Sequence, residues 1–441
     1  MLRLGFAPVP DSGTLPLMTS PPNTDSRTQR KDGRAWAIRV LFSAGEISTA
    51  EPYFLPIGET MIGRATSEQH DLCFELDPAM SRQHATLDHT AGVLTLQDHS
   101  RNGSEVNGEL VEATPLKTGD IVRCGDTFAV VRLEPEIPDD APVRGLLGVS
   151  AVAKQVRAAI AEVASSSSAV LLHGESGTGK GIAARAIHDL SGRRGAWMQI
   201  NCAAVPEAIA DSSKIAKDKG GQQLPLTQGP LVEAQGGTLF IDEIAELALP
   251  HQQNLLEMLD ASTDIDTRLV TASHRDLGAE VHEGRFGLEL HARLATVVIW
   301  LPPLRERIED LLGVLAQHLG DAPPLSTALV DALLRYHWPY NFREVERMAT
   351  ELTVRGAGYE ALVPELIEEH LQSSLLRPAP SVPSVQPPPQ RLAPPSADSL
   401  RDLLSHHSGK LDSVAAALGQ SPEQIHRWLA QYGIEIDDFR S

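Results

Sequence analysis

The rhythm of hydrophobic and polar positions changes along this chain of 441 residues. Between residues 36 and 134, short apolar runs are separated by Gly, Asn and Asp turns. The clearest runs are Ile38–Phe42, Val93–Leu96 and Phe128–Leu133. Regularly spaced short strands without a long helical pattern are typical of an all-β sandwich, so we predict one over 36–134.

From about residue 146 to residue 372, helical and extended patterns alternate. The helical stretches are Val152–Ala164, Gly181–Leu190 and Pro250–Leu259. The apolar runs between them are Val170–Leu172, Leu239–Ile241 and Val297–Leu301. This alternation predicts an α/β domain on a mostly parallel sheet, and from Ser326 onward the pattern is helical only.

Three further segments differ in composition. Residues 1–35 are rich in Pro, Ser, Thr and Arg, and we interpret them as a disordered leader. Residues 378–395 hold eight prolines in eighteen positions, which predicts an extended linker over 373–398. Residues 399–441 contain three short helical patterns and predict a small all-α domain.

The composition of the chain excludes several classes of protein. The chain has 38 Lys and Arg against 58 Asp and Glu, a formal net charge of −20, which argues against a coating of basic charge for nonspecific nucleic-acid binding. No apolar run approaches the ~18 residues of a membrane helix. Cys73, Cys124 and Cys202 are too few and too widely spaced for a disulfide framework or a zinc site. We expect a cytoplasmic protein without a membrane segment.

Loops of the predicted sandwich carry candidate phosphate-binding groups. Arg64 offers a guanidinium, Ser81 a hydroxyl and Asn102 an amide, a set that can bind a phosphate and hold a peptide backbone. Taken separately, Arg64 fits a surface ion pair, and Asn102-Gly103 fits a hairpin turn.

Taken together, these loops resemble the forkhead-associated (FHA) domain, which binds phosphothreonine peptides. The matching stretches are Ile62–Arg64, Ser81–His84 and Asp98–Gly103. The resemblance implies that Arg64 and Ser81 contact the phosphate of a phosphothreonine protein and that Asn102 contacts its backbone.

A glycine-rich stretch follows the apolar run that ends at Leu172, and a helix follows it. The candidate phosphate-binding residues are Gly174, Glu175, Ser176, Gly177, Thr178, Gly179, Lys180 and Gly181. Four residues separate Gly174 from the Gly179-Lys180 pair, which is the spacing of a phosphate-binding loop. Backbone N–H groups and the helix N-terminus favour an anion there, and Lys180 supplies a positive charge. Gly181 stands where Ser or Thr is usual and offers no hydroxyl to magnesium.

Two acids end a later apolar strand. Asp242 can hold Mg²⁺, and Glu243 can orient an attacking water, as in phosphoryl transfer. By themselves they fit a solubilising pair at a strand end. Beside a phosphate-binding loop, they predict a nucleotide-hydrolysing site.

The segment from 146 to 371 resembles the AAA+ domain of sigma-54-dependent bacterial transcription activators. The matching stretches are Gly174–Lys180, Asn201–Ala204, Gly236–Glu243, Leu301–Arg307 and Trp338–Glu344. The resemblance implies an α/β P-loop domain with a helical lid that binds ATP and Mg²⁺. It implies that Asp242 holds magnesium, that Glu243 activates water and that Asn201 is the polar partner of Glu243. It also implies that Arg343 senses nucleotide from the lid. Arg293 matches an arginine that reaches the neighbouring subunit's nucleotide, which implies a homo-oligomeric ring.

The chain departs from the family in places. The family loop written GAFTGA, which touches the sigma factor, corresponds to Gly220–Pro225, where Gln222 and Gln223 replace the aromatic residue and the threonine. Gly287 replaces a second arginine, and His274 stands where Asn is common. These departures predict intact nucleotide binding, leave room for slow hydrolysis, and predict loss of the usual contact with RNA polymerase carrying sigma-54.

The C-terminal segment begins its last helical pattern at Ser421-Pro422, a serine cap followed by proline. It resembles the Fis-type helix-turn-helix of the same activators. The residues left for DNA contact are Gln424, His426, Arg427 and Gln431. A helical cap or dimerisation bundle is the alternative, because four basic residues against seven acidic ones in 398–441 supply few phosphate contacts.

The sequence alone therefore supports two hypotheses about function. One is an ATP-binding transcriptional regulator controlled by FHA recognition of a phosphothreonine protein, which the helix-turn-helix favours. The other is a signalling scaffold that binds phosphopeptide and nucleotide without activating transcription, which the altered loop at Gly220–Pro225 favours.

Overall fold

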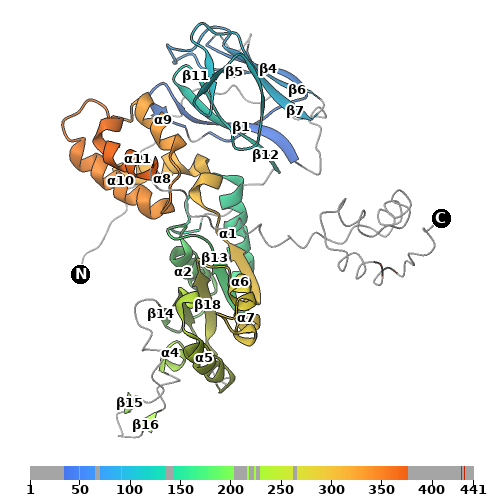
Figure 1. Ribbon diagram of the computed structural model, residues 1–441, viewed down its shortest axis with the longest axis vertical. Helices are drawn as coiled ribbons and strands as arrows, with labels where there is room; N and C mark the ends of the chain where they lie inside the picture. Colours follow the sequence, from blue (N-terminus) through green and yellow to red (C-terminus); the bar gives the residue numbers. More distant parts are fainter. Residues whose placement is uncertain are drawn as a thin grey trace. The chain divides into compact units, whose positions relative to one another are not determined.

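The chain divides into two units, Met1–Pro380 and Ser381–Ser441, and Figure 1 draws the described residues of the computed structural model as ribbons. In the first unit the described residues run from 34 to 375, except 49, 65–69, 91, 136–142, 203–215, 218–222, 225–228 and 262–265. In the second unit only Leu429, which is buried, and Tyr432 are described, and both are helical. The predicted residues that lie outside the described part are Gln424, His426, Arg427, Gln431, Gly220, Gly221, Gln222 and Pro225.

The N-terminal domain is a sandwich of two mainly antiparallel sheets, which confirms the all-β prediction. The first sheet has the order β2-β1-β12-β11-β8-β9, with β3 paired to β1. Its strands are β1 (Arg34–Ser43), β2 (Glu46–Ile47), β3 (Tyr53–Phe54), β8 (Ser104–Val106), β9 (Glu109–Val111), β11 (Ile121–Cys124) and β12 (Thr127–Pro135). The second sheet has the order β10-β7-β6-β4-β5. Its strands are β4 (Gly58–Gly63), β5 (Leu72–Cys73), β6 (Ala85–Thr90), β7 (Val93–Asp98) and β10 (Ala113–Leu116).

The central domain contains a five-stranded parallel sheet with the order β14-β17-β18-β13-β19. Its strands are β13 (Val170–His173), β14 (Trp197–Asn201), β17 (Thr238–Asp242), β18 (Arg268–Ser273) and β19 (Val297–Trp300). The helices around it are α1 (Ala151–Ala164), α2 (Lys180–Leu190), α4 (Gly229–Glu233), α5 (Leu249–Ala261), α6 (Leu277–His282) and α7 (Leu288–Leu294). Two short strands, β15 (Ala216–Lys217) and β16 (Gln223–Leu224), pair as an antiparallel hairpin. The predicted α/β domain is confirmed.

Both faces of this parallel sheet are buried, because successive strand residues point to opposite faces. In β13, Val170 and Leu172 join a core with Ile160 of α1 and Ile187 of α2. Leu171 joins a second core with residues of α5, α6 and α7. The uninterrupted apolar run that predicted this strand is therefore explained by helices on both sides.

The lid follows β19 and contains helices only, as predicted from Ser326 onward. Its elements are η3 (Leu304–Glu306), η4 (Ile308–Asp310), α8 (Leu311–Leu319), α9 (Thr327–Arg335), α10 (Asn341–Arg355), η5 (Pro364–Ile367) and α11 (Glu368–Leu375). The Ser326 side chain accepts a hydrogen bond from Leu329 N and caps α9, which explains why the helix begins there.

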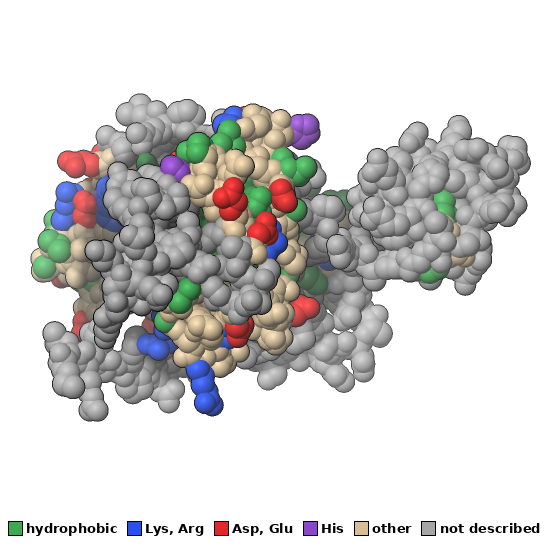
Figure 2. Space-filling model, turned by 90° about the horizontal axis from the view of Figure 1, so that it is seen from below, with side chains coloured by type: hydrophobic (Ala, Val, Ile, Leu, Met, Phe, Trp, Pro, Cys, Tyr) green, Lys and Arg blue, Asp and Glu red, His purple; other side chains and the backbone are tan. Residues whose placement is uncertain are grey.

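Acidic side chains lie at several places on the face of the molecule that Figure 2 draws. On the face drawn in Figure 2, they lie among hydrophobic and uncharged side chains, and Lys and Arg do not gather into one patch. In the part of the chain that is described, no helix is both long and apolar enough to cross a bilayer.

A buried carboxylate joins the lid to the start of the central domain. The Asp310 side chain is fully buried and accepts hydrogen bonds from Val149 N (2.6 Å), Ser150 N (2.8 Å) and Ser150 Oγ (2.8 Å). Arg307 Nε also donates to it at 2.5 Å, and Arg307 Nη2 donates to Leu147 O at 2.9 Å. This network fixes the segment that precedes α1 against the lid.

We expect Asp310→Ala to lower the free energy of unfolding by about 3–5 kcal/mol, because it leaves the Arg307 charge and two N–H groups buried without their partner. Asp189→Ala is the matched control, since Asp189 forms an exposed pair with Arg185 and should change stability by at most about 0.5 kcal/mol. Urea denaturation of the full chain, followed by tryptophan fluorescence, measures both. Equal stabilities for the two variants would contradict the structural role of Asp310.

Candidate functional site

The glycine-rich loop after β13 has the conformation that its sequence predicts. Gly177 has φ of +81° and Gly179 has φ of +100°, a region that other residues rarely adopt. A Cβ on Gly177 would lie 2.0 Å from Tyr340 O, so this position also admits no side chain. The loop then passes into α2 at Lys180, and the N-terminus of the helix faces the loop.

The side chain of Lys180 contacts the backbone of this loop. Its Nζ donates to Gly174 O at 2.8 Å and to Glu175 O at 3.0 Å, and it lies 4.0 Å from Glu243 Oε1. Burial lowers the pKa of Lys180 from its ordinary value, against the opposing effect of the Glu243 and Asp242 charges. The ammonium therefore lies where an incoming phosphate would replace carbonyl oxygens as its partner.

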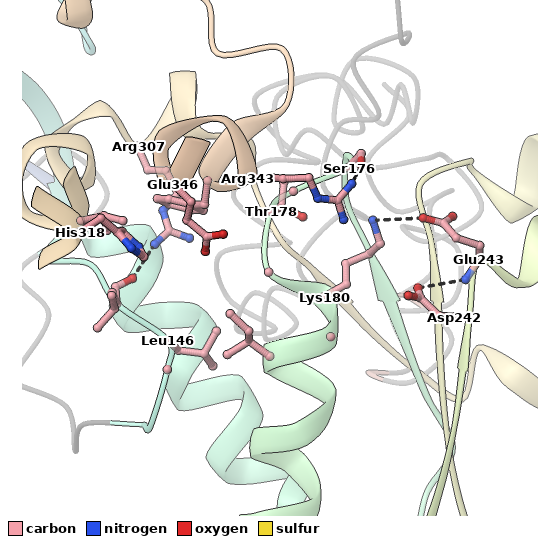
Figure 3. A pocket seen from close by; sticks show the side chains of 18 residues that line it. Leu146, Ser176, Thr178, Lys180, Asp242, Glu243, Arg307, His318, Arg343 and Glu346 are labelled. Carbon is pink, nitrogen blue, oxygen red and sulfur yellow. Dashed lines mark hydrogen bonds and ion pairs between the residues drawn. The ribbon is translucent and has the colours of Figure 1, made fainter. Parts of the chain in front are cut away.

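A cavity of about 350 Å³ lies between this loop and the lid (Figure 3). Lys180, Asp242 and Glu243 lie at one end of it, and Leu146 and His318 lie at the other. The remaining lining residues are Gly145, Leu147, Ser176, Gly177, Thr178, Gly179, Gly181, Ile182, Arg307, Val314, Phe342, Arg343 and Glu346. One end therefore carries the phosphate-binding loop and the other is lined by both apolar and charged side chains, which suits a ligand that carries phosphates.

The acid pair lies at the carboxyl end of β17, beside the phosphate-binding loop. Glu243 has a left-handed φ of +53°, and its N–H donates to Asp242 Oδ1 at 3.0 Å. Burial, followed by the charge of Glu243, raises the pKa of Asp242. Burial acts to raise the pKa of Glu243 as well, but the hydrogen bond from His274 and the charge of Lys180 hold it below its usual value. Glu243 therefore remains an anion, as a general base requires.

His274 is the partner that the structure gives to Glu243. His274 Nδ1 donates to Glu243 Oε2 at 2.5 Å, from the loop that follows β18. This hydrogen bond raises the pKa of His274, while burial acts in the opposite direction. The sequence marked His274 only as a departure from the family, so this contact is a new finding.

Residues of the lid contact the phosphate-binding loop directly. Arg305 donates to both carboxylate oxygens of Glu175, at 2.8 and 2.6 Å. Asn341 Nδ2 donates to Ser176 O at 2.9 Å, and Arg343 Nη1 donates to Ser176 Oγ at 3.1 Å. Burial acts to raise the pKa of Glu175, yet the hydrogen bonds from Arg305 and Asn341 hold it below its ordinary value. Arg343, for which the resemblance implies a sensor role, lines the cavity and contacts the phosphate-binding loop.

The other two predicted residues lie in different surroundings. Asn201 pairs in register with Asp242 across β14 and β17, so it ends its strand beside the acid pair. Arg293 does not line the cavity. Its Nη1 lies 2.8 Å from Asp260 Oδ1, and its Nη2 donates to Leu259 O at 3.2 Å. An arginine that acts on a neighbouring subunit's nucleotide need not face its own cavity.

The donor set fits magnesium only together with a nucleotide. Within the described residues, no three His, Cys, Asp or Glu side chains converge as a metal site. Gly181 has no side chain, and the Thr178 hydroxyl donates to Glu175 O at 2.9 Å. Asp242 would therefore hold Mg²⁺ as one ligand among phosphate oxygens and water, which is the usual pattern for this ion.

The predicted phosphopeptide residues lie on adjacent loops of the sandwich. Arg64 N donates to Ser81 O at 3.0 Å, and Asn102 Nδ2 donates to Ala79 O at 3.2 Å. Both side chains are exposed, and Ser81 is half-buried. Buried His84 accepts a hydrogen bond from Ser81 N at 3.0 Å and holds that loop in place. The three predicted side chains are therefore brought to one end of the sandwich.

The sequence did not identify the lid residues at the end of the cavity away from Lys180. Val314 and His318 are four residues apart in α8 and so share a helix face, a spacing that could have been noticed. Arg305 and Asn341 belong to stretches quoted for the resemblance, but their contacts with Glu175 were not predicted.

Two protein families match the chain. The family described as Sigma-54 interaction domain matches residues 146–300. The family described as FHA domain matches residues 60–125. These matches cover the parallel sheet with its phosphate-binding loop and most of the sandwich.

Relatives match over longer stretches. The DNA-binding transcriptional regulator NtrC of Salmonella typhimurium is 36% identical over 268 residues, 56% of this chain and 56% of NtrC. The regulatory protein LuxO of Vibrio vulnificus is 34% identical over 322 residues, 65% of this chain and 69% of LuxO. The chain thus spans about half the length of NtrC. A crystal structure of NtrX from Brucella abortus in complex with ATP is 23% identical, with a TM-score of 0.46, over 66% of this chain and 69% of that one.

We expect the pKa of His274 to lie above its ordinary value of 6.5 in the nucleotide-free protein and to fall in Glu243→Gln, because an amide stabilises the imidazolium less than a carboxylate does. The test is a pH titration of the imidazole NMR signals in the full chain. Glu289→Gln is the control, since Glu289 is exposed in α7 and should leave the His274 titration unchanged. An unaltered His274 pKa in Glu243→Gln would show that the contact is absent in solution.

Proposed function

This chain belongs to the sigma-54 activator family, and on that premise we propose that it is an ATP-binding transcriptional regulator governed by a phosphothreonine protein. The FHA domain would recognise the phosphoprotein, and the AAA+ domain would bind and hydrolyse ATP. The C-terminal segment would contact DNA through Gln424, His426, Arg427 and Gln431.

The cavity between the phosphate-binding loop and the lid carries this proposal. Lys180 and the loop N–H groups would bind the phosphates, and Arg343 would approach them from the lid. When Mg²⁺ is bound with the nucleotide, it supplies charge neutralisation at the phosphates. Glu243 would accept a proton from the attacking water, which requires that it exchange its hydrogen bond with His274 for one with water.

Phosphothreonine recognition rests on the loops of the sandwich. Arg64 would form a charge-assisted hydrogen bond with the phosphate, Ser81 would donate its hydroxyl, and the Asn102 amide would hold the peptide backbone.

Arg293 would complete a neighbour's site in a homo-oligomeric ring. In one chain Arg293 is bound to α5 through Asp260 and Leu259. Ring assembly would then exchange this contact for one with the adjacent subunit's nucleotide.

The altered loop favours a second candidate, a signalling scaffold that binds phosphopeptide and nucleotide without activating transcription. The family presents an aromatic residue and a threonine in the loop that corresponds to Gly220–Pro225, and in this chain Gln223 lies in β16, paired with Lys217. Gln222 and Gln223 take their places, and burying an amide without partners costs about 1–3 kcal/mol. Contact with RNA polymerase carrying sigma-54 would therefore be lost.

We expect Arg64→Ala to weaken binding of a phosphothreonine peptide by about tenfold or more, because a charge-assisted hydrogen bond contributes about 1.5–3 kcal/mol. Calorimetry on the full chain measures this, with Lys117→Ala as the control because Lys117 is exposed elsewhere on the sandwich. Equal affinity of the wild type for phosphorylated and unphosphorylated peptides would remove phosphothreonine from the proposal.

We expect no ATP-dependent open-complex formation with RNA polymerase carrying sigma-54, since the contacting side chains are replaced. A reconstituted transcription assay tests this, with DNA footprinting of the same samples. A footprint without open complexes supports a regulator that acts in another way, and no footprint supports the scaffold. Open complexes formed by the wild type but not by Glu243→Gln, which keeps the shape and removes the base, would contradict the loss of contact.

A further inference from the structure

The sheet that contains β1 and β12 is apolar on both faces. In β12, Ala129 and Val131 point into the core of the sandwich. The alternate residues Phe128 and Val130 point to the opposite face, yet they are 1% and 0% exposed. Phe42 in β1 is likewise 0% exposed. A sandwich usually presents polar side chains on its outer face, so this face is built to be covered.

The lid covers it. Leu41, Phe42, Phe128 and Val130 belong to one continuous hydrophobic core with residues of the lid helices. The members from α8 are Leu311, Leu312, Val314, Leu315 and Leu319. Ile47 of β2 and Ile121 of β11 pack against the same core.

Polar contacts fix the position of the two surfaces. Arg132 Nη2, from β12, donates to Glu309 Oε2 at 2.6 Å and to Glu306 O at 3.0 Å. The Glu309 side chain is 3% exposed, so this ion pair is largely removed from water. Such a pair specifies one geometry, because breaking it leaves a buried charge unpaired.

Helix α8, which packs against the sandwich, also forms a wall of the nucleotide cavity. Val314 and His318 of α8 line the cavity, and so does Arg307, which lies directly before η4. A change in the position of α8 on nucleotide binding must therefore act on the interface with the sandwich.

Hydrogen bonds continue from the interface to the phosphopeptide loops. Thr127, next to Phe128, donates through its hydroxyl to Asp77 Oδ2 at 2.7 Å. The other oxygen of buried Asp77 accepts hydrogen bonds from Ala79 N (2.9 Å) and Met80 N (3.2 Å), directly before Ser81. Ala79 O accepts the hydrogen bond from Asn102 Nδ2. Two of the three candidate phosphopeptide residues are thus held by groups attached to the interface strand.

We propose that the sandwich is an extension of the ATPase lid, so that phosphopeptide binding and nucleotide binding alter each other's affinity through the Phe128 and Arg132 interface. The inference rests on the proposed function, because it needs both ligands to bind. Binding free energies are reciprocal, so the factor by which nucleotide changes peptide affinity equals the factor by which peptide changes nucleotide affinity.

The experiment measures both affinities on the full chain. One probe is a fluorescent phosphothreonine peptide selected from a random library against this protein, and the other is a non-hydrolysable fluorescent ATP analogue with Mg²⁺. In the wild type we expect each saturating ligand to change the affinity for the other by at least about fivefold, with equal factors in both directions.

Variants test whether the coupling between the two ligands passes through the interface of the sandwich with the lid. Arg132→Ala should bring the coupling factor to within about twofold of unity while each ligand alone still binds, and Arg132→Lys should restore part of the coupling. Lys117→Ala is the control and should couple as the wild type does. Lys180→Ala should retain peptide binding and lose the nucleotide effect, and Arg64→Ala should retain nucleotide binding and lose the peptide effect.

The outcomes separate the inference from the proposed function. If both ligands bind the wild type and their affinities are independent within twofold, the coupling is wrong and the proposed function stands. If coupling persists unchanged in Arg132→Ala, the interface is not its route and the inference is overturned. If either ligand fails to bind, the proposed function fails and the inference falls with it.

Discussion

One carboxylate, that of Glu175, joins the phosphate-binding loop to the lid, and the cavity lies between these two parts of the chain. Glu175 receives two hydrogen bonds from Arg305 and a longer one from Asn341 Nδ2, at 3.3 Å. Asn341 is fully buried, has a left-handed φ of +52°, and accepts a hydrogen bond from Leu304 N through its other amide atom. Asparagine tolerates this conformation better than most residues. These contacts bring the start of η3 and the start of α10 onto the same loop, and both walls of the cavity follow from that.

Most of the fold could be predicted because its signals are local. The α1 and α2 patterns, the buried runs of β13 and β17, and the spacing from Gly174 to Lys180 each lie within a few consecutive residues. The Glu243 contact with His274 could not be predicted, since 31 residues separate them and their meeting depends on β17 and β18 being neighbours. The packing of the lid against the outer face of the sandwich was not predicted either. The run Phe128–Leu133 predicted a strand, but alternation in a strand says only that two faces differ, and it does not say what lies against each.

Two charged side chains of the cavity have hydrogen-bond partners within the protein. Lys180 is held by two carbonyl oxygens, and Glu243 is held by His274. Pairing of this kind lowers the cost of burying charge.

The apolar outer face of β1 and β12 limits how far the sandwich can be separated from the rest of the chain. The sequence places a domain boundary between residues 134 and 146, yet the core that contains Phe42 and Phe128 runs across that boundary. Cutting there would leave a water-exposed patch of aromatic and branched side chains on the sandwich, a surface prone to self-association. Joining this sandwich to a different nucleotide-binding domain would require a lid with matching shape and an acid opposite Arg132. The sandwich and the lid therefore share one hydrophobic core, even though each has a recognisable fold of its own.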